Sequence, residues 1–325
     1  MKLLKSILLA SSMALTAMPV AAEEYKMLSS WDQNYAYNPD LLYPFMEGVK
    51  KATEGRVTMS FNGPEAVPPF EQLEPVGSGV FHFLFTHGAY HLGTTPIATI
   101  ADAIVATPDE VHSSGLFDYM DKHYQEFGLK LVVLPVTPVG AYHIYTREPV
   151  SEKGDLAGRK LRGSPTYTPI VELLGAVLVV LPASEVYTAL DSGLIDGGAW
   201  PAVGVLDYKW YEVASYLLRP SFGVNYEPIF MNLDAWSKLS PEDQTAILAF
   251  GKDLEKSWYE VSPKIWQREE QALIDKGMKI TEMGEEQKAK VAQAWSDGLW
   301  KLGAGQNADV TADFSAFAES KGLKK

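Results

Sequence analysis

Cysteine is absent from this 325-residue chain, and that absence excludes several kinds of chemistry. Without thiols there is no disulfide framework, no thiolate zinc site and no cysteine nucleophile. Positive charge is also scarce: 28 Lys and Arg stand against 41 Asp and Glu, a net charge of −13. Because nucleic-acid binding needs a basic surface that neutralises phosphates, we expect no nucleic-acid partner. A small anion stays possible, since one buried arginine can dominate a pocket.

Recognisable catalytic and cofactor motifs are missing as well. The sequence contains no G-x-S-x-G, no H-E-x-x-H and no glycine-rich phosphate loop. His87 and His91 are four residues apart, but Gly88 and Gly93 make a helix there improbable, and no third metal ligand can be nominated. We therefore expect no catalytic residue, no metal and no cofactor.

Long hydrophobic runs are limited to the N-terminus, where residues 7–18 are uncharged and mostly apolar. This run is well short of the ~20 residues that span a bilayer. Lys2 and Lys5 precede it, and the small residues Val20-Ala21-Ala22 follow it. This pattern predicts a cleaved signal peptide over residues 1–22 and export to the periplasm. Loss of the two lysines would change the net charge from −13 to −15.

The rest of the composition is that of a globular protein, with 46% hydrophobic and 21% charged residues. At roughly 100–200 residues per domain, the length suggests two domains. Apolar spacing predicts alternating strands and helices after Glu23. The expected strands are 25–31, 56–61, 80–85, 129–134, 141–146, 159–162, 177–181 and 195–200. The expected helices are 41–52, 71–76, 169–174, 184–192 and 241 to about 274.

Three of these strands, 80–85, 129–134 and 141–146, read as largely apolar runs, which is typical of buried parallel strands. The rhythm predicts an open α/β sheet with ligand chemistry at the carboxyl ends of its strands. Ser184 is a candidate N-cap of the helix 184–192. Ser240 followed by Pro241 and two acidic residues is a strong start for the long helix.

Aromatic residues are abundant, and several fall at predicted strand ends or in loops: Trp31, Tyr90, Tyr142, Trp200 and Tyr226. Each by itself is more often a core residue, but several converging at strand ends would form a ligand pocket. Arg162 ends a short predicted strand, and its planar guanidinium matches a carboxylate. On spacing alone, a surface arginine is the commoner alternative.

The region around Arg162 resembles the signature region of DctP-type solute-binding proteins, which serve tripartite ATP-independent periplasmic (TRAP) transporters. The resemblance rests on residues 156–162 (LAGRKLR), 174–176 (LGA), 181–190 (LPASEVYTAL) and 193–197 (GLIDG). Weaker similarity extends to residues 53–57, 230–232 and 236–239.

The resemblance implies two α/β domains that close over an organic acid, with a long connecting helix. It implies domain I at 23–139 plus 226–265 and domain II at 140–225 plus 266–325. The matching arginine, Arg162, would form a salt bridge to the ligand carboxylate. The implied partners are a small-molecule organic acid and the small and large membrane subunits of a TRAP permease, with the protein itself a monomer.

Three positions depart from patterns within that family. Ala183 replaces an aromatic residue, Trp200 stands in place of an asparagine, and Tyr142 occupies the position of a second arginine after Gly140. One carboxylate clamp thus remains while aromatic surface is gained, which favours an aromatic or branched monocarboxylate over dicarboxylates and sialic acid. The predicted ligand-binding residues are Arg162, Trp200, Tyr142, Ala183, Tyr90, His87, Trp31 and Tyr226.

Two other functions remain open on the sequence. An exported enzyme acting on an organic acid would need a base in the cleft, and only His87 or His91 can be named. A ligand sensor for a membrane kinase would use the same closure as a transport protein.

Overall fold

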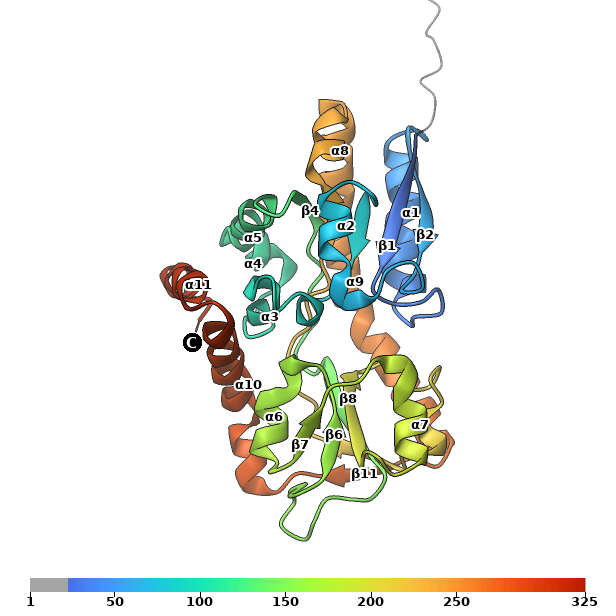
Figure 1. Cartoon of the computed structure of the whole chain (residues 1–325), viewed down its shortest axis with the longest axis vertical. Helices are drawn as coiled ribbons and strands as arrows, with labels where there is room; N and C mark the ends of the chain where they lie inside the picture. Colours follow the sequence, from blue (N-terminus) through green and yellow to red (C-terminus); the bar gives the residue numbers. More distant parts are fainter. Residues whose placement is uncertain (1–22, 325) are drawn as a thin grey trace, which may run out of the picture.

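The computed structural model describes residues 23–324 and shows two α/β lobes, one above the other in Figure 1. The predicted signal peptide, residues 1–22, lies outside the described residues. Each lobe is built on its own sheet, and a long helix, α9, runs from the first lobe into the second. The predicted fold class, a two-lobed α/β protein with a long connecting helix, is therefore confirmed.

The first lobe contains a five-stranded sheet in the order β2-β1-β3-β10-β4. Its strands are β1 (Glu23–Ser29), β2 (Val57–Asn62), β3 (Phe83–Phe85), β4 (Leu129–Val133) and β10 (Ile229–Asn232). The helices of this lobe are α1 (Tyr43–Ala52), α2 (Leu73–Gly77), α3 (Ile97–Ala101), α4 (Pro108–Ser113), α5 (Leu116–Gln125) and α8 (Leu233–Lys238). Strands β2, β1 and β3 are parallel, whereas β10 is antiparallel to both of its neighbours.

The second lobe contains a six-stranded sheet in the order β11-β9-β5-β8-β6-β7. Its strands are β5 (Tyr142–Thr146), β6 (Lys160–Arg162), β7 (Val177–Val179), β8 (Gly197–Pro201), β9 (Tyr216–Arg219) and β11 (Lys279–Glu282). Helices α6 (Thr168–Leu173) and α7 (Val186–Asp191) belong to this lobe. Strand β6, which carries Arg162, lies in parallel between β7 and β8.

Helix α9 (Pro241–Asp275) joins the lobes and begins where the sequence predicts. The Ser240 hydroxyl accepts a hydrogen bond from the Asp243 N–H at 3.0 Å, a standard N-cap contact. The first part of α9 packs on α1 and β4 of the first lobe. Beyond Pro263, Glu269 accepts hydrogen bonds from the loop after β8. One helix therefore contacts both lobes.

The last two helices are α10 (Glu285–Gln306) and α11 (Ala308–Ser320). Helix α10 packs on α6 of the second lobe and on α3 of the first. Helix α11 belongs to the first lobe, where Phe314 packs in one core cluster with Phe117 and the Tyr119 hydroxyl donates to Asp313 at 2.6 Å. The predicted division assigned all of 266–325 to domain II. The packing of α11 differs from it, because its apolar residues are buried against α3 and α5.

Two details of the predicted sheet are wrong. Strand β4 pairs only with the antiparallel β10, and β5 is antiparallel to β8 and β9, although both segments read as buried parallel strands. A largely apolar run indicates a strand buried on both faces, and antiparallel strands inside a covered sheet are buried in the same way.

The predicted N-cap of α7 is also wrong. Ser184 lies in a 3₁₀ turn, and the helix begins after Glu185 without a side-chain cap.

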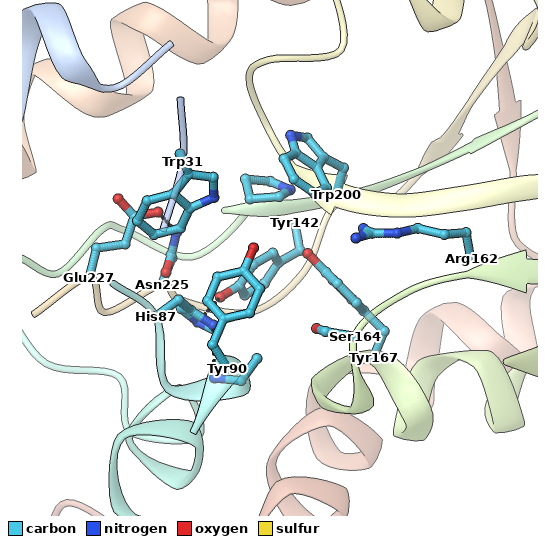
Figure 2. Close-up of a pocket in the computed structure, with 12 residues that line it drawn as sticks. Trp31, His87, Tyr90, Tyr142, Arg162, Ser164, Tyr167, Trp200, Asn225 and Glu227 are labelled. Carbon is cyan, nitrogen blue, oxygen red and sulfur yellow. Dashed lines mark hydrogen bonds between the residues drawn. The ribbon is translucent and has the colours of Figure 1, made fainter. Parts of the chain in front are cut away.

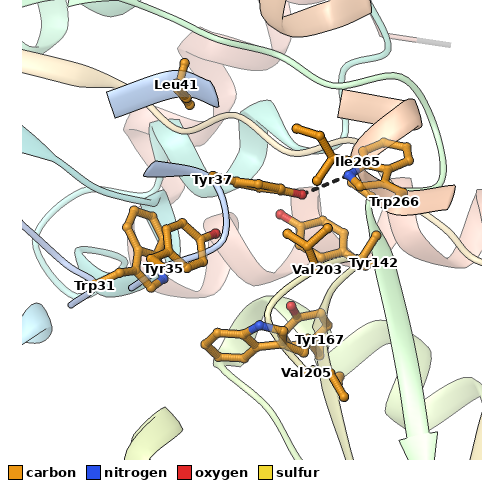
Figure 3. Close-up of a cluster of buried hydrophobic side chains, with 14 of the residues drawn as sticks. Trp31, Tyr35, Tyr37, Leu41, Tyr142, Tyr167, Val203, Val205, Ile265 and Trp266 are labelled. Atoms are coloured by element: carbon orange, nitrogen blue, oxygen red, sulfur yellow. Dashed lines mark hydrogen bonds between the residues drawn. The ribbon is translucent and has the colours of Figure 1, made fainter. Parts of the chain in front are cut away.

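A cluster of buried side chains continues across the junction of the lobes (Figure 3). In this cluster Tyr37, which follows β1, points towards Tyr142 of β5 and Trp266 of α9, whereas Tyr35 lies against Trp31. The indole Nε1 of Trp266 donates to the Tyr37 hydroxyl at 3.0 Å. Within the described part of the chain, no helix combines the length and apolarity needed to cross a membrane.

Candidate functional site

A buried cavity lies between the lobes, and both contribute its walls (Figure 2). The first lobe supplies the segments that follow β1 and β3 and the segment that precedes β10. The second lobe supplies the ends of β6 and β8 and the start of β5. The lining residues are Trp31, His87, Ala89, Tyr90, Tyr142, Arg162, Ser164, Tyr167, Trp200, Pro201, Asn225 and Glu227. The carboxyl ends of β1, β3, β6 and β8 meet at this cavity, as an α/β architecture predicts.

Arg162 is the only arginine or lysine among the lining residues. It is 4% exposed, so its guanidinium is almost entirely withdrawn from water. Nε donates to the Leu181 carbonyl at 2.9 Å and Nη1 to the Ala199 carbonyl at 3.3 Å. These two bonds hold the guanidinium plane in place, while Nη2 has no partner among residues 23–324.

No carboxylate of the described residues neutralises Arg162. Burial lowers the pKa of the guanidinium, and the neighbours that raise it are three tyrosines, Tyr90, Tyr167 and Tyr208. The guanidinium carbon lies 4.9 Å from the Trp200 ring centroid, a cation–π contact that fixes the relative position of the two side chains. A buried cation without a counter-ion is costly, and a bound anion would relieve that cost.

Aromatic rings make up much of the remaining wall. Trp31 stacks on Tyr35 with centroids 4.5 Å apart and planes 5° apart, and it meets Tyr90 edge-on at 5.9 Å. Trp200 packs against Tyr208 and Trp210 with centroids 5.6 and 5.7 Å away. Rings held by other rings lose little freedom when a ligand packs on them, so this wall suits a flat or apolar ligand body.

Two residues of the first lobe, Glu227 and Asn225, carry hydrogen-bond acceptors on the side of the cavity opposite Arg162 (Figure 2). Glu227 is 2% exposed, and its Oε1 accepts from the Tyr35 hydroxyl and from the Asn225 amide, both at 2.9 Å. Its Oε2 has no hydrogen-bond partner among the described residues, nor does the amide oxygen of Asn225. Burial raises the pKa of Glu227 to about 7, against the lowering effect of those two donors.

His87, Asp102 and Tyr142 form a polar contact between the lobes. The Tyr142 hydroxyl donates to Oδ2 of Asp102 at 2.7 Å and lies 3.0 Å from Nε2 of His87. Nε2 of His87 is 2.9 Å from the same carboxylate oxygen, and Nδ1 accepts from the Ala89 N–H at 3.1 Å. Burial by itself lowers the pKa of His87, but Asp102 raises it overall. His87 and Asp102 of the first lobe are thus both engaged with Tyr142 of the second lobe.

An outer chamber of about 380 Å³ adjoins the inner cavity, whose own free volume is about 30 Å³. Trp31, Tyr90 and Arg162 border both spaces. The outer wall is largely apolar, with Phe70 and the prolines Pro68 and Pro69 from the first lobe facing a short segment around Ala183 from the second. The inner cavity therefore suits a polar head group, and the outer chamber suits a larger body.

The structure brings together most of the residues that the sequence nominated. Six of them line the inner cavity: Arg162, Trp200, Tyr142, Tyr90, His87 and Trp31. Ala183 lines the outer chamber. Tyr226 is the exception: its side chain packs in the first-lobe core, and its hydroxyl donates to the Ile104 carbonyl at 3.0 Å. Alternation along an extended segment turns Tyr226 away from the cavity and places its two neighbours, Asn225 and Glu227, on the wall.

Sequence reasoning missed Asn225, Glu227, Ser164 and Tyr167. Tyr226 could have pointed to Asn225 and Glu227, because neighbouring residues in an extended chain point in opposite directions.

Neither His87 nor His91 is placed as a free base. His91 is buried, its Nε2 lies 3.1 Å from the Thr86 hydroxyl, and burial lowers its pKa to about 3. No group of three potential metal-ligating side chains occurs within residues 23–324.

Comparison with known families gives one match that covers most of the chain. The family model of bacterial extracellular solute-binding proteins, family 7 (DctP), matches residues 30–302. A curated relative, a monocarboxylate 2-oxoacid-binding periplasmic protein of Nostoc sp., is 26% identical over 212 residues, which are 60% of this chain and 56% of that protein. This chain therefore matches a little over half the length of that relative.

Solved structures share the fold at low sequence identity. A TRAP periplasmic solute-binding protein from Desulfovibrio salexigens with bound orotic acid has a TM-score of 0.79 at 18% identity, covering 92% of this chain and 98% of that one. A Bordetella pertussis extracytoplasmic solute receptor that binds pyroglutamic acid has a TM-score of 0.76 at 20% identity, covering 91% and 99%. Both likenesses extend over the two lobes together.

Proposed function

Because the chain belongs to the DctP family of bacterial extracellular solute-binding proteins, we propose that it captures an organic acid between its lobes and delivers it to a TRAP permease. It would act in the periplasm, after removal of residues 1–22. The observation that carries this proposal is Arg162, a buried guanidinium without a carboxylate partner in the described chain, on the wall of a cavity that both lobes form.

Capture would proceed by closure of the lobes. Arg162 and Trp200 belong to the second lobe, whereas Trp31, Tyr90 and Glu227 belong to the first. A ligand that contacts both walls gains more interactions in the closed form than in an open one, so binding shifts the population towards closure. The closed form is then the state that a permease would recognise.

The cavity supports a monocarboxylate with an aromatic or branched body as the ligand. Arg162 is the sole permanent cation on the lining, and the opposite wall carries Glu227. A second carboxylate on the ligand would meet Glu227 or Tyr142, whose hydroxyl already donates to Asp102. Burying that extra charge unpaired costs several kcal/mol. The 2-oxoacid, orotic acid and pyroglutamic acid in the names of the relatives agree with a single carboxylate.

A thermal-shift screen on ligand-stripped, refolded protein tests this proposal. Phenylpyruvate, phenyllactate, branched 2-oxo acids and cyclic acids should raise the melting temperature more than succinate, malate or sialic acid. A ligand at a hundredfold excess over its Kd stabilises the folded state by about 2.7 kcal/mol, which such a screen detects readily. If succinate or sialic acid displaced every aromatic acid in competition, the monocarboxylate assignment would be wrong.

Trp200 provides a second test, directed at the ligand body. Trp200→Ala should weaken the preferred aromatic acid by more than tenfold, because stacking and apolar burial are lost at about 25 cal/mol per Å². Trp236→Ala is the matched control, since Trp236 packs in the first lobe away from the cavity. An unchanged affinity in Trp200→Ala would remove this side chain from the ligand contacts.

Delivery to a permease is tested by reconstitution. The ligand-loaded protein, added outside proteoliposomes that contain candidate TRAP membrane subunits, should support uptake driven by an ion gradient. Uptake that is equally fast without the protein, or with a non-binding variant, would argue for another role of the closed form, such as presentation to a sensor kinase.

A further inference from the structure

The two sides of the inner cavity have opposite hydrogen-bonding character (Figure 2). On the second-lobe side, Arg162 offers donors only, since a guanidinium has no acceptor. On the first-lobe side, Glu227 and Asn225 each retain an acceptor oxygen without a partner among the described residues. The cavity is therefore built to receive an acceptor at one end of the ligand and a donor at the other.

The free acceptors of Glu227 and Asn225 are fixed in place. The Asn225 amide nitrogen donates to Oε1 of Glu227 at 2.9 Å, and this bond leaves the amide oxygen, rather than the nitrogen, unpaired. The Tyr35 hydroxyl donates to the same Oε1 at 2.9 Å, and Tyr35 is itself stacked on Trp31. Oε2 of Glu227 thus remains as a preorganised acceptor in a nearly dry wall, where an unmade hydrogen bond is costly.

We propose that the ligand carries a hydrogen on nitrogen in addition to its carboxylate, and that Glu227 and Asn225 accept that N–H while Arg162 binds the carboxylate. The ligand class is that of acids bearing an ammonium, lactam or other ring N–H. This inference rests on the proposed organic-acid binding and adds the second recognition contact to it. An N–H group satisfies the orphaned acceptors, whereas a keto, ether or ester oxygen in that position would face them without a hydrogen to share.

The electrostatics of the site agree with this assignment. Burial raises the pKa of Glu227 to about 7, so the ionised carboxylate is held at a cost that a donor on the ligand would offset. Asp102 adds to that cost, and His87 reduces it. No lysine or arginine besides Arg162 lines the cavity among the described residues, so the chain does not itself provide the partner of Glu227.

Matched ligand pairs test the inference on the wild-type protein. Pyroglutamate is compared with 5-oxotetrahydrofuran-2-carboxylate, which replaces the ring N–H by oxygen and keeps the carboxylate and ring size. Phenylalanine is compared with phenylpyruvate, which replaces the ammonium by a keto oxygen that carries no hydrogen, on the same body. By calorimetry at pH 8, the N–H acid of at least one pair should bind tenfold or more tightly than its oxygen counterpart.

Variants assign the preference to Glu227. Glu227→Gln should reduce the affinity for the N–H acid by tenfold or more and change that for the oxygen counterpart by less than threefold. Glu126→Gln is the control, since it removes an equal charge from an exposed position outside the cavity. Thermal unfolding checks that Glu227→Gln is folded, and the wild-type comparison stands without that variant.

Failure of this inference is distinguishable from failure of the proposed function. Equal or tighter binding of the oxygen acid in both pairs would overturn the N–H contact. So would Arg162-dependent binding of nitrogen-free acids alone. In either case, the proposal of organic-acid capture would still stand, provided that Arg162→Ala abolished the binding of the acids that wild type binds. If no acid bound, or if Arg162→Ala bound every probe normally, the proposed function itself would be wrong.

Discussion

The proposed carboxylate capture depends on Arg162, whose surroundings favour the binding of an anion. Two backbone carbonyls orient it, and the Trp200 ring lies against it, but no carboxylate of the described chain pairs with it. A fixed, dry guanidinium binds a planar anion without having to be reorganised first. Its bonding pattern also leaves Nη2 for the ligand.

Arg162→Ala should therefore lower ligand affinity by more than a hundredfold, because loss of one partner of a buried ion pair costs about 3–5 kcal/mol. Arg162→Lys should also bind poorly, since an ammonium lacks the planar fork. Isothermal titration calorimetry with the best acid from the screen measures both. Arg159→Ala, at a half-buried arginine outside the cavity whose guanidinium donates to the Glu148 and Pro149 carbonyls, is the control and should bind normally. Near-normal affinity in either Arg162 variant would exclude Arg162 from the site.

Glu227 predicts a pH dependence of stability in the ligand-free protein. Its pKa is raised from 4.5 to about 7 by burial, so the folded state binds its proton more tightly than the unfolded chain does. The stability that this proton contributes is fully present below pH 4.5 and is lost as the pH rises to 7. A shift of this size corresponds to about 3 kcal/mol. The groups that act on this carboxyl are Tyr35, Asn225, His87 and Asp102.

The measurement compares wild type with Glu227→Gln by urea unfolding at pH 4.5 and pH 7.5. The free energy of unfolding of wild type relative to the variant should fall by about 3 kcal/mol between the two pH values. The difference cancels groups on which Glu227 does not act, such as His91 and His143, whose lowered pKa values make them titrate in the opposite sense. His87 is not cancelled, because Glu227 raises its pKa. A difference that is constant with pH would show that Glu227 titrates normally.

At the scale of elements, α9 positions the loop that follows β8. Glu269 on α9 is 8% exposed, and its two oxygens accept from the Gly204 N–H at 2.8 Å and the Leu206 N–H at 2.9 Å. This loop continues directly from Trp200 and Pro201 at the cavity wall. The helix that links the lobes therefore also supports one wall of the site.

Glu269→Ala should lower the free energy of unfolding by about 2–4 kcal/mol, because two buried N–H groups lose their acceptor. Glu269→Gln keeps one acceptor oxygen, so its free energy of unfolding should lie between those of wild type and Glu269→Ala. Chemical denaturation at pH 8 measures both. Gln267→Ala, at an exposed position of the same helix, should change stability by less than about 0.5 kcal/mol. A loss in Glu269→Ala no larger than that of the control would mean that the loop holds its shape without the helix.

At the scale of the whole molecule, the two lobes share a junction that can serve as a pivot. The Tyr142 hydroxyl bonds Asp102 across it, and the Trp295 indole on α10 donates to the Asp102 carbonyl at 2.8 Å. The chain passes between the lobes on several segments, including α9 and the stretch leading to β10 (Figure 1). Several connections favour one rigid-body motion and let each lobe keep its own core.

Small-angle scattering should accordingly show a smaller radius of gyration for ligand-saturated than for ligand-stripped protein. The reason is that the ligand contacts lie on both walls and are complete only when the lobes approach. Arg162→Ala at the same ligand concentration should keep the larger value, which separates closure from a non-specific effect of the acid. Identical profiles of stripped and saturated wild-type protein would contradict hinge closure.

The amino-acid sequence by itself determined the class of the fold and the start of α9, and it nominated Arg162, which the structure places on the cavity wall. Apolar periodicity and N-capping are local signals, and they act through neighbours a few positions away. Arg162 was found because a short motif around it resembles a family, although spacing alone favoured a surface arginine.

Only the tertiary structure decided strand direction, the placement of α11 and the wall opposite Arg162. An apolar run such as 129–134 is equally suited to parallel and antiparallel partners, so its pairing depends on where β10 returns to the sheet. Tyr226 and Glu227 are adjacent in sequence, yet one packs in the core and the other borders the cavity. That difference arises from a side-chain direction that long-range packing sets, and it places the free acceptors of Glu227 and Asn225 across the cavity from Arg162.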